Sequence, residues 1–447
     1  MTNLNIDLSL RGGKIKPMNA VNNGPTSAGV RNASNTNFDA YKALNIPYAR
    51  NHDASFYAGY GGEHTVDVHR IFKNFSADEN DPASYIFEPT DAYIKNTLDA
   101  NTKIFYRLGA SIEHQYKYGT RVPADYEKWA RICEHIIRHY NEGWANGFEY
   151  GIEYWEIWNE PDCHNADGSN PCWQGTNEEF ADFFDVAVRY LKKTFPNLKI
   201  GGPAIAGLWW PDSEEILTAI FKRKTPLDFL SYHWYGKEMG PFTESLNKAR
   251  ELLDSHGYDK TETILNEWNY IYGWSGDDWN YSLATEKNIK GASFVLAAML
   301  VAQNSPLDML MYYDARPCGM NGLFVGGTSK CLKPYYSFKI FDELRALGTQ
   351  IPTELATNDI YTLAATNEKT AALALTYYNN DDTKEEKEVK LSFKNAKGKK
   401  KVTCSLLDDN HDLLLTREEI FTSDEFSLYL RFPLFTSYLV KIEDLEA

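Results

Sequence analysis

The chain has 447 residues, more than one hydrophobic core usually holds, so we expect two domains. Its composition is that of a globular protein, and its formal net charge of −16 argues against nucleic acid and anionic membranes as partners, because basic surfaces bind both. No apolar run predicts a membrane-spanning helix, and the start of the chain lacks the features of a signal peptide. We therefore expect a cytoplasmic protein. A periplasmic or secreted protein whose signal peptide has been removed is the alternative.

Strand-like and helix-like segments alternate through residues 11–347. The strand-like runs are 14–21, 46–50, 102–108, 152–158, 198–202, 227–234, 262–266 and 307–313. Helical periodicity occurs at 38–44, 125–140, 178–194, 213–223, 245–256, 286–304 and 334–347. This alternation predicts an α/β fold, a (β/α)₈ TIM barrel. An open doubly wound sheet is disfavoured, because no Gly-x-Gly-x-x-Gly follows the first strand.

The pattern becomes all-β after residue 347. Short alternating runs occur at 360–365, 370–378, 386–393, 402–407, 413–416, 426–432 and 435–442. Charged or turn-prone clusters separate these runs, which is typical of a small β-sandwich. We therefore predict an accessory β-sandwich domain over residues 348–447. Residues 5–10, before the first barrel strand, also have strand character.

The most informative segment is 154–162, an apolar strand-like run followed by an amide, a carboxylate and a proline. Because side chains alternate between the two faces of a strand, Glu156 and Trp158 are expected to point the same way. Pro161 has no N–H to give to a neighbouring strand and therefore ends the ladder. Glu160 is thus expected at the C-terminal end of the strand.

A second segment, 263–269, repeats this plan with Asn266 and Glu267 after a short apolar run. Two carboxylates at strand ends suit retaining glycoside hydrolysis, in which one acid protonates the leaving oxygen and the other attacks the anomeric carbon. Asn159 is expected to bind the sugar hydroxyl beside the reacting carbon. Most glutamates are ordinary surface carboxylates, so the prediction of Glu160 and Glu267 as a catalytic pair depends on the repeated pattern.

At these motifs the chain resembles glycoside hydrolase family 39, a family of β-xylosidases and α-L-iduronidases in the clan of retaining glycosidases built on (β/α)₈ barrels. The resemblance covers the two Asn–Glu motifs and the segments 16–25, 49–53 and 231–236. It implies that Glu160, after the fourth strand, is the acid/base and that Glu267, after the seventh, is the nucleophile. It also implies that the strand at 5–10 joins the β-sandwich.

Polar residues at other strand ends complete the predicted site. By the resemblance, Arg50 supports the nucleophile and His52 contacts the sugar. His233 and Tyr235 end the strand beside the nucleophile strand, and we expect them to orient Glu267 and to bind hydroxyl groups. For all four residues the alternative is that they are satisfied buried polar groups.

The predicted sugar pocket also includes aromatic and charged residues. Trp268 belongs to a set of aromatic residues near the barrel mouth that suit the C–H faces of sugars, with core packing as the alternative. After the last strand, xylosidases of the resembling family have a Trp and acidic residues, whereas this chain has Tyr313, Asp314 and Arg316. We expect these three to shape the terminal subsite. The leading expectation is an exo-acting β-xylosidase on plant-type oligosaccharides; arabinosyl or galactosyl substrates and endo action are the alternatives.

Other chemistries find less support in the sequence. We expect no metal and no cofactor, because neither His-x-His on a strand nor His-Glu-x-x-His on a helix occurs. A catalytically silent carbohydrate-binding barrel is the alternative of a different class, and the two glutamates argue against it. Of the six cysteines, Cys163 and Cys172 bracket one short loop and Cys318 and Cys331 another, so each pair could form a disulfide, which would favour an exported protein.

Overall fold

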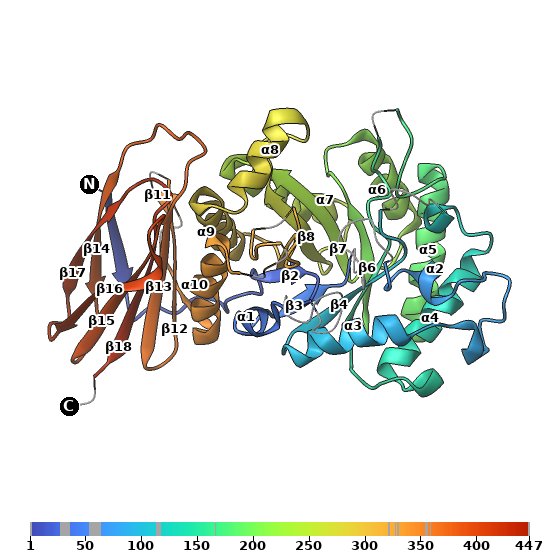
Figure 1. Cartoon of the computed structure of the whole chain (residues 1–447), viewed down its shortest axis with the longest axis horizontal. Coiled ribbons are helices and arrows are strands. Elements are labelled where there is room, and N and C mark those ends of the chain that lie inside the picture. Colours follow the sequence, from blue (N-terminus) through green and yellow to red (C-terminus); the bar gives the residue numbers. More distant parts are fainter. Residues whose placement is uncertain are drawn as a thin grey trace.

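The computed structural model describes residues 2–26, 36–52, 64–112, 118–165, 167–320, 322–326, 328, 330–353, 356–357 and 359–445. Figure 1 shows a barrel surrounded by helices and, beside it, a β-sandwich that includes the N-terminal strand. Both predicted architectures are therefore confirmed.

Eight parallel strands close the barrel, each pairing with the next and the last with the first. They are β2 (Ala20–Asn22), β3 (Tyr48–Arg50), β4 (Lys103–Leu108), β5 (Tyr154–Ile157), β6 (Lys199–Ile205), β7 (Phe229–Gly236), β8 (Glu262–Tyr270) and β9 (Met309–Tyr312). The first strand is much shorter than the predicted run at 14–21. Pro17 lies within that run and has no N–H for a ladder, and Lys14 instead bridges to Thr349 next to the sandwich.

Aromatic side chains fill one end of the barrel interior. The rings of Phe105, Tyr154 and Phe229 lie within 5.7 Å of one another, measured between centroids, and Ala20 and Met309 belong to the same buried cluster. This apolar plug occupies the interior near the N-terminal ends of the strands. Polar residues that face the barrel axis are therefore concentrated toward the C-terminal ends, where catalytic residues of such barrels lie.

Helices cover the outside of the barrel (Figure 1). They are α1 (Phe38–Lys42), α2 (Val68–Ile71), α3 (Glu88–Asp99), α4 (Tyr126–Asn141), α5 (Asn177–Thr194), α6 (Pro211–Arg223), α7 (Met239–Ser255), α8 (Gly276–Thr285), α9 (Ile289–Gln303) and α10 (Lys333–Leu347). Helix α3 was not predicted from the sequence, because its buried stripe consists of Thr90, Ile94 and Thr97 and so lacks a strong apolar period. Among the described residues, no helix is both long enough and apolar enough to cross a bilayer.

Helix α9 is buried on all sides because it lies between the barrel and the sandwich (Figure 1). It begins after Asn288, whose side chain accepts hydrogen bonds from the N–H groups of Lys290 and Gly291. On the sandwich side, the Ser293 hydroxyl donates to the Tyr377 carbonyl at 2.7 Å. An amphipathic helix would leave polar residues in this interface, so the nearly continuous apolar sequence of α9 follows from its place in the fold.

The accessory domain packs a three-stranded sheet on a larger one. The strands are β1 (Thr2–Asp7), β10 (Thr349–Ile351), β11 (Ala356–Thr357), β12 (Ile360–Thr366), β13 (Thr370–Tyr377), β14 (Lys387–Lys394), β15 (Lys400–Leu407), β16 (Asp412–Phe421), β17 (Phe426–Phe432) and β18 (Ser437–Asp444). The smaller sheet has the order β1-β14-β17, and β10-β12-β13-β18-β15-β16 form the larger one, with β11 beside β12. Strand β1 runs parallel to β14 and lies a few residues earlier than the predicted run at 5–10. Leu4 and Ile6 of β1 point into the core between the sheets, together with Leu373, Leu391 and Leu428.

Candidate active site

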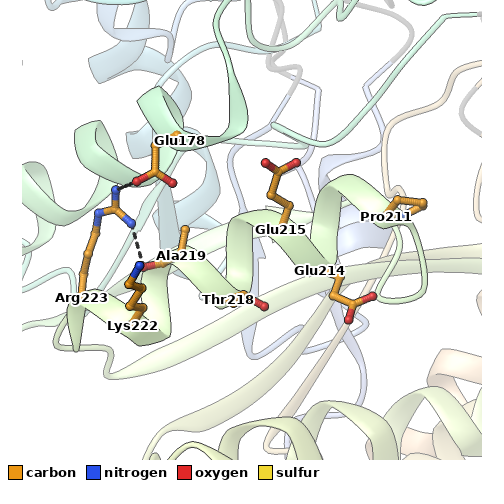
Figure 2. A pocket seen from close by; sticks show the side chains of 8 residues that line it. All are labelled: Glu178, Pro211, Glu214, Glu215, Thr218, Ala219, Lys222 and Arg223. Atoms are coloured by element: carbon orange, nitrogen blue, oxygen red, sulfur yellow. Dashed lines mark hydrogen bonds and ion pairs between the residues drawn. The ribbon is translucent and has the colours of Figure 1, made fainter.

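A surface pocket on the outside of the barrel lies apart from the predicted site. The pocket has a volume of about 410 Å³. Figure 2 shows the side chains around it, which come from Glu178 of α5 and from α6. Arg223 pairs there with Glu178 and Asp182. None of the predicted site residues lines the cavity, whose lining is Glu178, Pro211, Glu214, Glu215, Thr218, Ala219, Lys222 and Arg223. The candidate site is instead at the C-terminal end of the barrel.

Strand β5 leaves the barrel ladder at Ile157, and the next residue has a left-handed backbone. Trp158 has φ 77°, and its ring turns outward onto Trp173 at 5.2 Å between centroids. Glu156 points into the barrel, so the expectation that it shares a face with Trp158 is wrong: side-chain alternation ends where the strand ends. As a result Asn159, rather than Trp158, turns toward the barrel interior.

Glu160 is held in an unusual backbone conformation by the neighbouring loop. Its φ is 47°, a region that non-glycine residues rarely occupy without support from their surroundings. Its N–H donates to the Ala204 carbonyl at 2.9 Å. Two residues later, the buried carboxylate of Asp162 accepts hydrogen bonds from the Ala206 N–H and the Ser213 hydroxyl, and burial raises the pKa of Asp162 to about 6. Asp162 thus ties the loop that carries Glu160 to the end of β6, a role that the sequence analysis did not assign.

Glu267 lies within β8, which continues to Tyr270. Because Glu267 faces the barrel interior, its neighbour Trp268 must face the helices. Trp268 is fully buried, and its ring packs against Phe242, Phe294 and Tyr312. The prediction that Trp268 binds substrate is therefore wrong, and its alternative, core packing, is correct.

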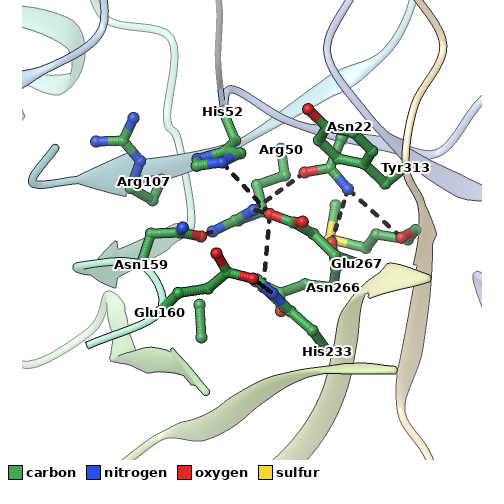
Figure 3. A network of polar contacts seen from close by, with 12 residues as sticks. Asn22, Arg50, His52, Arg107, Asn159, Glu160, His233, Asn266, Glu267 and Tyr313 are labelled. Atoms are coloured by element: carbon green, nitrogen blue, oxygen red, sulfur yellow. Dashed lines mark hydrogen bonds and ion pairs between the residues drawn. The ribbon is translucent and has the colours of Figure 1, made fainter. Parts of the chain in front are cut away.

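Arg50, at the end of β3, joins the two motifs (Figure 3). Its Nε donates to Glu156 Oε2 at 2.6 Å, and its Nη1 donates to Glu267 Oε1 at 2.6 Å and to Asn22 Oδ1 at 3.1 Å. Its Nη2 donates to Asn159 Oδ1 at 2.7 Å. One buried cation thus fixes the position of the predicted nucleophile and of the amide beside the predicted acid.

Glu156 balances this buried cation and was not among the predicted site residues. Besides Arg50, it accepts hydrogen bonds from the Ser231 hydroxyl at 2.6 Å and from Asn266 Nδ2 at 2.5 Å. A buried charge is costly unless it is paired and hydrogen-bonded, and all these partners are buried. The sequence did indicate a special role for Glu156, because it is an ionisable residue inside the apolar run before Asn159.

Three further predicted residues surround the two glutamates, and Figure 3 shows two of them, His52 and His233. His233 Nδ1 lies 2.8 Å from Glu160 Oε1, and its Nε2 lies 3.5 Å from Glu267 Oε1. The Tyr235 hydroxyl donates to Glu267 Oε2 at 2.9 Å, and His52 Nε2 lies 3.4 Å from Glu267 Oε1. Burial lowers the pKa of His233 to about 4 and the pKa of His52 well below its ordinary value, so both rings are neutral near pH 7.

The two glutamates lie close together in different surroundings. One oxygen of each carboxylate lies within 4.8 Å of the other and of His233. Retaining glycosidases have carboxyl groups about 5–5.5 Å apart, whereas inverting enzymes separate them by about 6.5–9.5 Å. The Arg50 cation contacts Glu267 and favours its ionised form, while the neutral His233 that contacts Glu160 provides no such charge. This difference lets one carboxyl act as an acid beside an ionised nucleophile.

The residues after β9 approach the site through Tyr313. The Tyr313 ring lies 6.4 Å from the His52 ring, and Arg316 Nη2 donates to the Tyr313 hydroxyl at 3.3 Å. Arg316 pairs with the buried Asp314 at 2.8 Å, and Asp314 also accepts from the Arg316 N–H at 2.7 Å. Asp314 and Arg316 therefore hold each other and support Tyr313.

Two clusters of described residues have potential metal ligands within 4.8 Å of one another. Glu160, His233 and Glu267 form the first cluster, which is the carboxylate pair with the histidine that contacts both glutamates. Glu160, Cys163 and Cys172 form the second. All six cysteines of the chain are free thiols in the structure, including the two pairs considered for disulfides.

Comparison with known proteins identifies the family. The model for glycosyl hydrolases family 39 matches residues 62–413. The chain belongs to this family. The family 39 chain is 25% identical over 323 residues to a β-xylosidase of Caldicellulosiruptor saccharolyticus, covering 66% of this chain and 64% of that protein. It is 29% identical over 184 residues to a β-xylosidase of Geobacillus stearothermophilus, covering 37% of this chain and 33% of that protein. The chain thus spans less than two thirds of the length of either relative.

Solved structures show the same architecture as this family 39 chain. A glucosidase from Croceicoccus marinus superposes with a TM-score of 0.80 at 20% identity, over 100% of both chains. A monomeric β-xylosidase from Caulobacter crescentus superposes with a TM-score of 0.72 at 14% identity, also over 100% of both chains. These similarities support the barrel with its β-sandwich, and the predicted resemblance to family 39 is confirmed.

Proposed function

We propose that this family 39 chain is a retaining, exo-acting glycosidase that hydrolyses β-xylosides of plant-type oligosaccharides. The observation that carries the proposal is the pair Glu160 and Glu267, whose nearest oxygens lie within 4.8 Å. The Arg50 cation contacts Glu267, and the neutral imidazole of His233 contacts Glu160. Separation and surroundings together fit double displacement.

In the first step, Glu267 attacks the anomeric carbon and forms a covalent glycosyl ester, while Glu160 gives its proton to the leaving oxygen. Arg50 and Tyr235 each donate to one oxygen of Glu267 and so hold the carboxylate in place for the attack. The neutral His233 contacts Glu160 and adds no positive charge that would favour its ionised form.

In the second step, Glu160 is ionised and accepts a proton from the water that attacks the ester, which releases the sugar with its anomeric configuration retained. We infer that Asn159 binds the sugar in both steps. Its Oδ1 is taken by Arg50, and its buried Nδ2 has no hydrogen-bond partner among the described residues. A sugar hydroxyl beside the anomeric carbon would accept a hydrogen bond from this N–H. A sugar that lacks this hydroxyl would leave the buried donor unpaired.

The preference for a β-xyloside rests on the two β-xylosidases that the chain resembles in sequence. An aromatic wall beside the site supports binding of a second sugar ring. The exposed ring of Trp274 lies 5.2 Å from the Tyr235 ring and stacks on Trp279 at 5.6 Å, both measured between centroids. Sugar C–H faces pack on such rings. Because Tyr235 also contacts Glu267, a ring on Trp274 would lie near the bond to be cleaved.

A panel of aryl glycosides tests the proposal. We expect the highest kcat/KM on the aryl β-xyloside and a first product with retained anomeric configuration by NMR. Glu267→Ala should be inactive on all glycosides of the panel. Glu262→Gln is the matched control, because Glu262 lies on the same strand at the opposite end and pairs with Lys199. Inverted product, or activity of Glu267→Ala near that of the parent, would overturn the mechanism, and sugar binding without turnover would indicate a carbohydrate-binding barrel.

A further inference from the structure

The second cluster of potential ligands lies on the loop that follows Glu160. One carboxylate oxygen of Glu160 and the sulfur atoms of Cys163 and Cys172 all lie within 4.8 Å of one another. Cys172 is buried, Cys163 is half-buried, and the Glu160 side chain is 18% exposed. The two thiols are separated by eight residues in the chain, so the loop brings them together beside the proposed acid/base.

The loop is held closed by hydrogen bonds that do not involve the thiols. Asn170 donates through Nδ2 to the Pro161 carbonyl at 2.6 Å and accepts through Oδ1 from the Cys172 N–H at 2.8 Å. The Cys172 carbonyl accepts from Trp158 Nε1 at 3.0 Å, and the Cys163 N–H donates to the Glu160 carbonyl at 3.1 Å. Both cysteine backbones are therefore fixed, and little reorganisation is needed to bring their sulfur atoms onto a common ligand.

The donor set selects a class of ligand. Two thiolates with one carboxylate suit a thiophilic divalent cation, and Zn²⁺ takes such ligands in tetrahedral geometry at about 2.0–2.3 Å. Hard cations such as Mg²⁺ and Ca²⁺ prefer oxygen ligands and are disfavoured here. Three protein ligands leave a fourth position for water. On binding, each thiol would release its proton to solvent.

We propose that Glu160, Cys163 and Cys172 form an inhibitory site for a thiophilic divalent cation of the zinc class. The cation would take the Glu160 oxygen as a ligand, and a coordinated carboxylate cannot donate a proton to the leaving group. Metal binding would therefore switch off glycoside cleavage without entering the sugar pocket. The inhibition rests on the proposed role of Glu160, whereas the binding itself does not.

Binding is tested on the full chain, reduced with a phosphine and then titrated with Cd²⁺. Cadmium bound to thiolates has an ultraviolet charge-transfer absorption, which serves as a readout independent of activity. We expect saturation at one Cd²⁺ per chain. Cys163→Ser and Cys172→Ser should each lose this absorption, and Cys163 is the safer variant because its side chain is only half-buried. Cys318→Ser is the matched control and should behave like the parent, since Cys318 lies in the loop after β9.

Inhibition is tested with Zn²⁺ and an aryl β-xyloside. Zn²⁺ should inhibit the parent and Cys318→Ser alike, and Cys163→Ser should need roughly tenfold more Zn²⁺ or more, because a serine hydroxyl is a poor ligand for a thiophilic cation. Equal inhibition of parent and Cys163→Ser would assign the metal to Glu160, His233 and Glu267 and overturn the proposal. Retention of the Cd²⁺ absorption in both cysteine variants would overturn it as well. A protein inactive on every glycoside would refute the proposed function, while the Cd²⁺ titration would still decide the metal site.

Discussion

Replacing Tyr235 with Phe removes one hydroxyl and keeps the ring against Trp274. The hydroxyl donates to Glu267 Oε2 at 2.9 Å, whereas Oε1 keeps its contact with Arg50 at 2.6 Å. A hydrogen bond to a charged group contributes about 1.5–3 kcal/mol, so its loss should move the acidic limb of the kcat/KM profile upward by about one to two pH units. At pH values below the acidic limb, kcat/KM of the variant should be roughly 10- to 150-fold lower than that of the parent.

On the plateau of the profile the loss should be smaller, under about tenfold. The negative charge of Glu267 decreases in the transition state as its oxygen begins to bond to the anomeric carbon, so the hydrogen bond then matters less. The assay is the pH dependence of kcat/KM on an activated aryl glycoside for the parent, Tyr235→Phe and the control Tyr272→Phe. Tyr272 is exposed, and its ring packs against Tyr281 and Lys237. An acidic limb at the parental pH, or the same loss at every pH, would refute the proposed support of Glu267 by Tyr235.

Three further outcomes are expected. Glu160→Ala should lose about 10²- to 10⁴-fold in kcat/KM on glycosides with poor leaving groups and far less on activated aryl glycosides; equal losses across a leaving-group series contradict its role as acid. Glu286 is buried with no hydrogen-bond partner among the described residues, and burial raises its pKa from 4.5 to about 8 although Lys287 lies 3.9 Å away. The free energy of unfolding should therefore fall by up to about 5 kcal/mol as the pH rises from 4.5 to 8, because the folded protein must then either keep the proton or bury the charge. Glu286→Gln should flatten that slope in denaturant titrations, and an unchanged slope refutes the assignment. Asp314→Ala removes one member of the buried Asp314–Arg316 ion pair and should destabilise the fold by about 3–5 kcal/mol while the ratio of kcat/KM between glycosides stays constant. An altered ratio at an unchanged melting temperature would instead make Asp314 a specificity residue.

Two predictions from the sequence failed because the strands do not end where the sequence patterns indicated. The strand before Asn159 was predicted to extend through Trp158, but β5 ends at Ile157 and the positive φ of Trp158 reverses the direction of its side chain. Trp268 fails for the opposite reason. Strand β8 continues past Glu267, so strict alternation places Trp268 against the helices. The end of a strand depends on pairing with distant segments, and no local pattern reports it.

Composition, periodicity and two short motifs determined the class of this protein. Hydrophobic periods are local properties of the chain, so the barrel strands, most of the helices and the β-sandwich could be predicted from them. The repeated Asn–Glu motif was sufficient to propose Glu160 and Glu267 as a pair, because a carboxylate near the C-terminal end of a barrel strand lies at the catalytic end of the fold.

Only the tertiary structure decided which polar groups meet. Arg50 contacts Glu156 and Glu267, residues 106 and 217 positions away in the chain, and closure of the barrel brings them together. Cys163 and Cys172 meet beside Glu160 because the loop between them is closed by hydrogen bonds of Asn170. Such contacts depend on the direction of each side chain and on the path of loops between strands. Those follow from packing against distant parts of the chain, which residue spacing in the sequence does not encode.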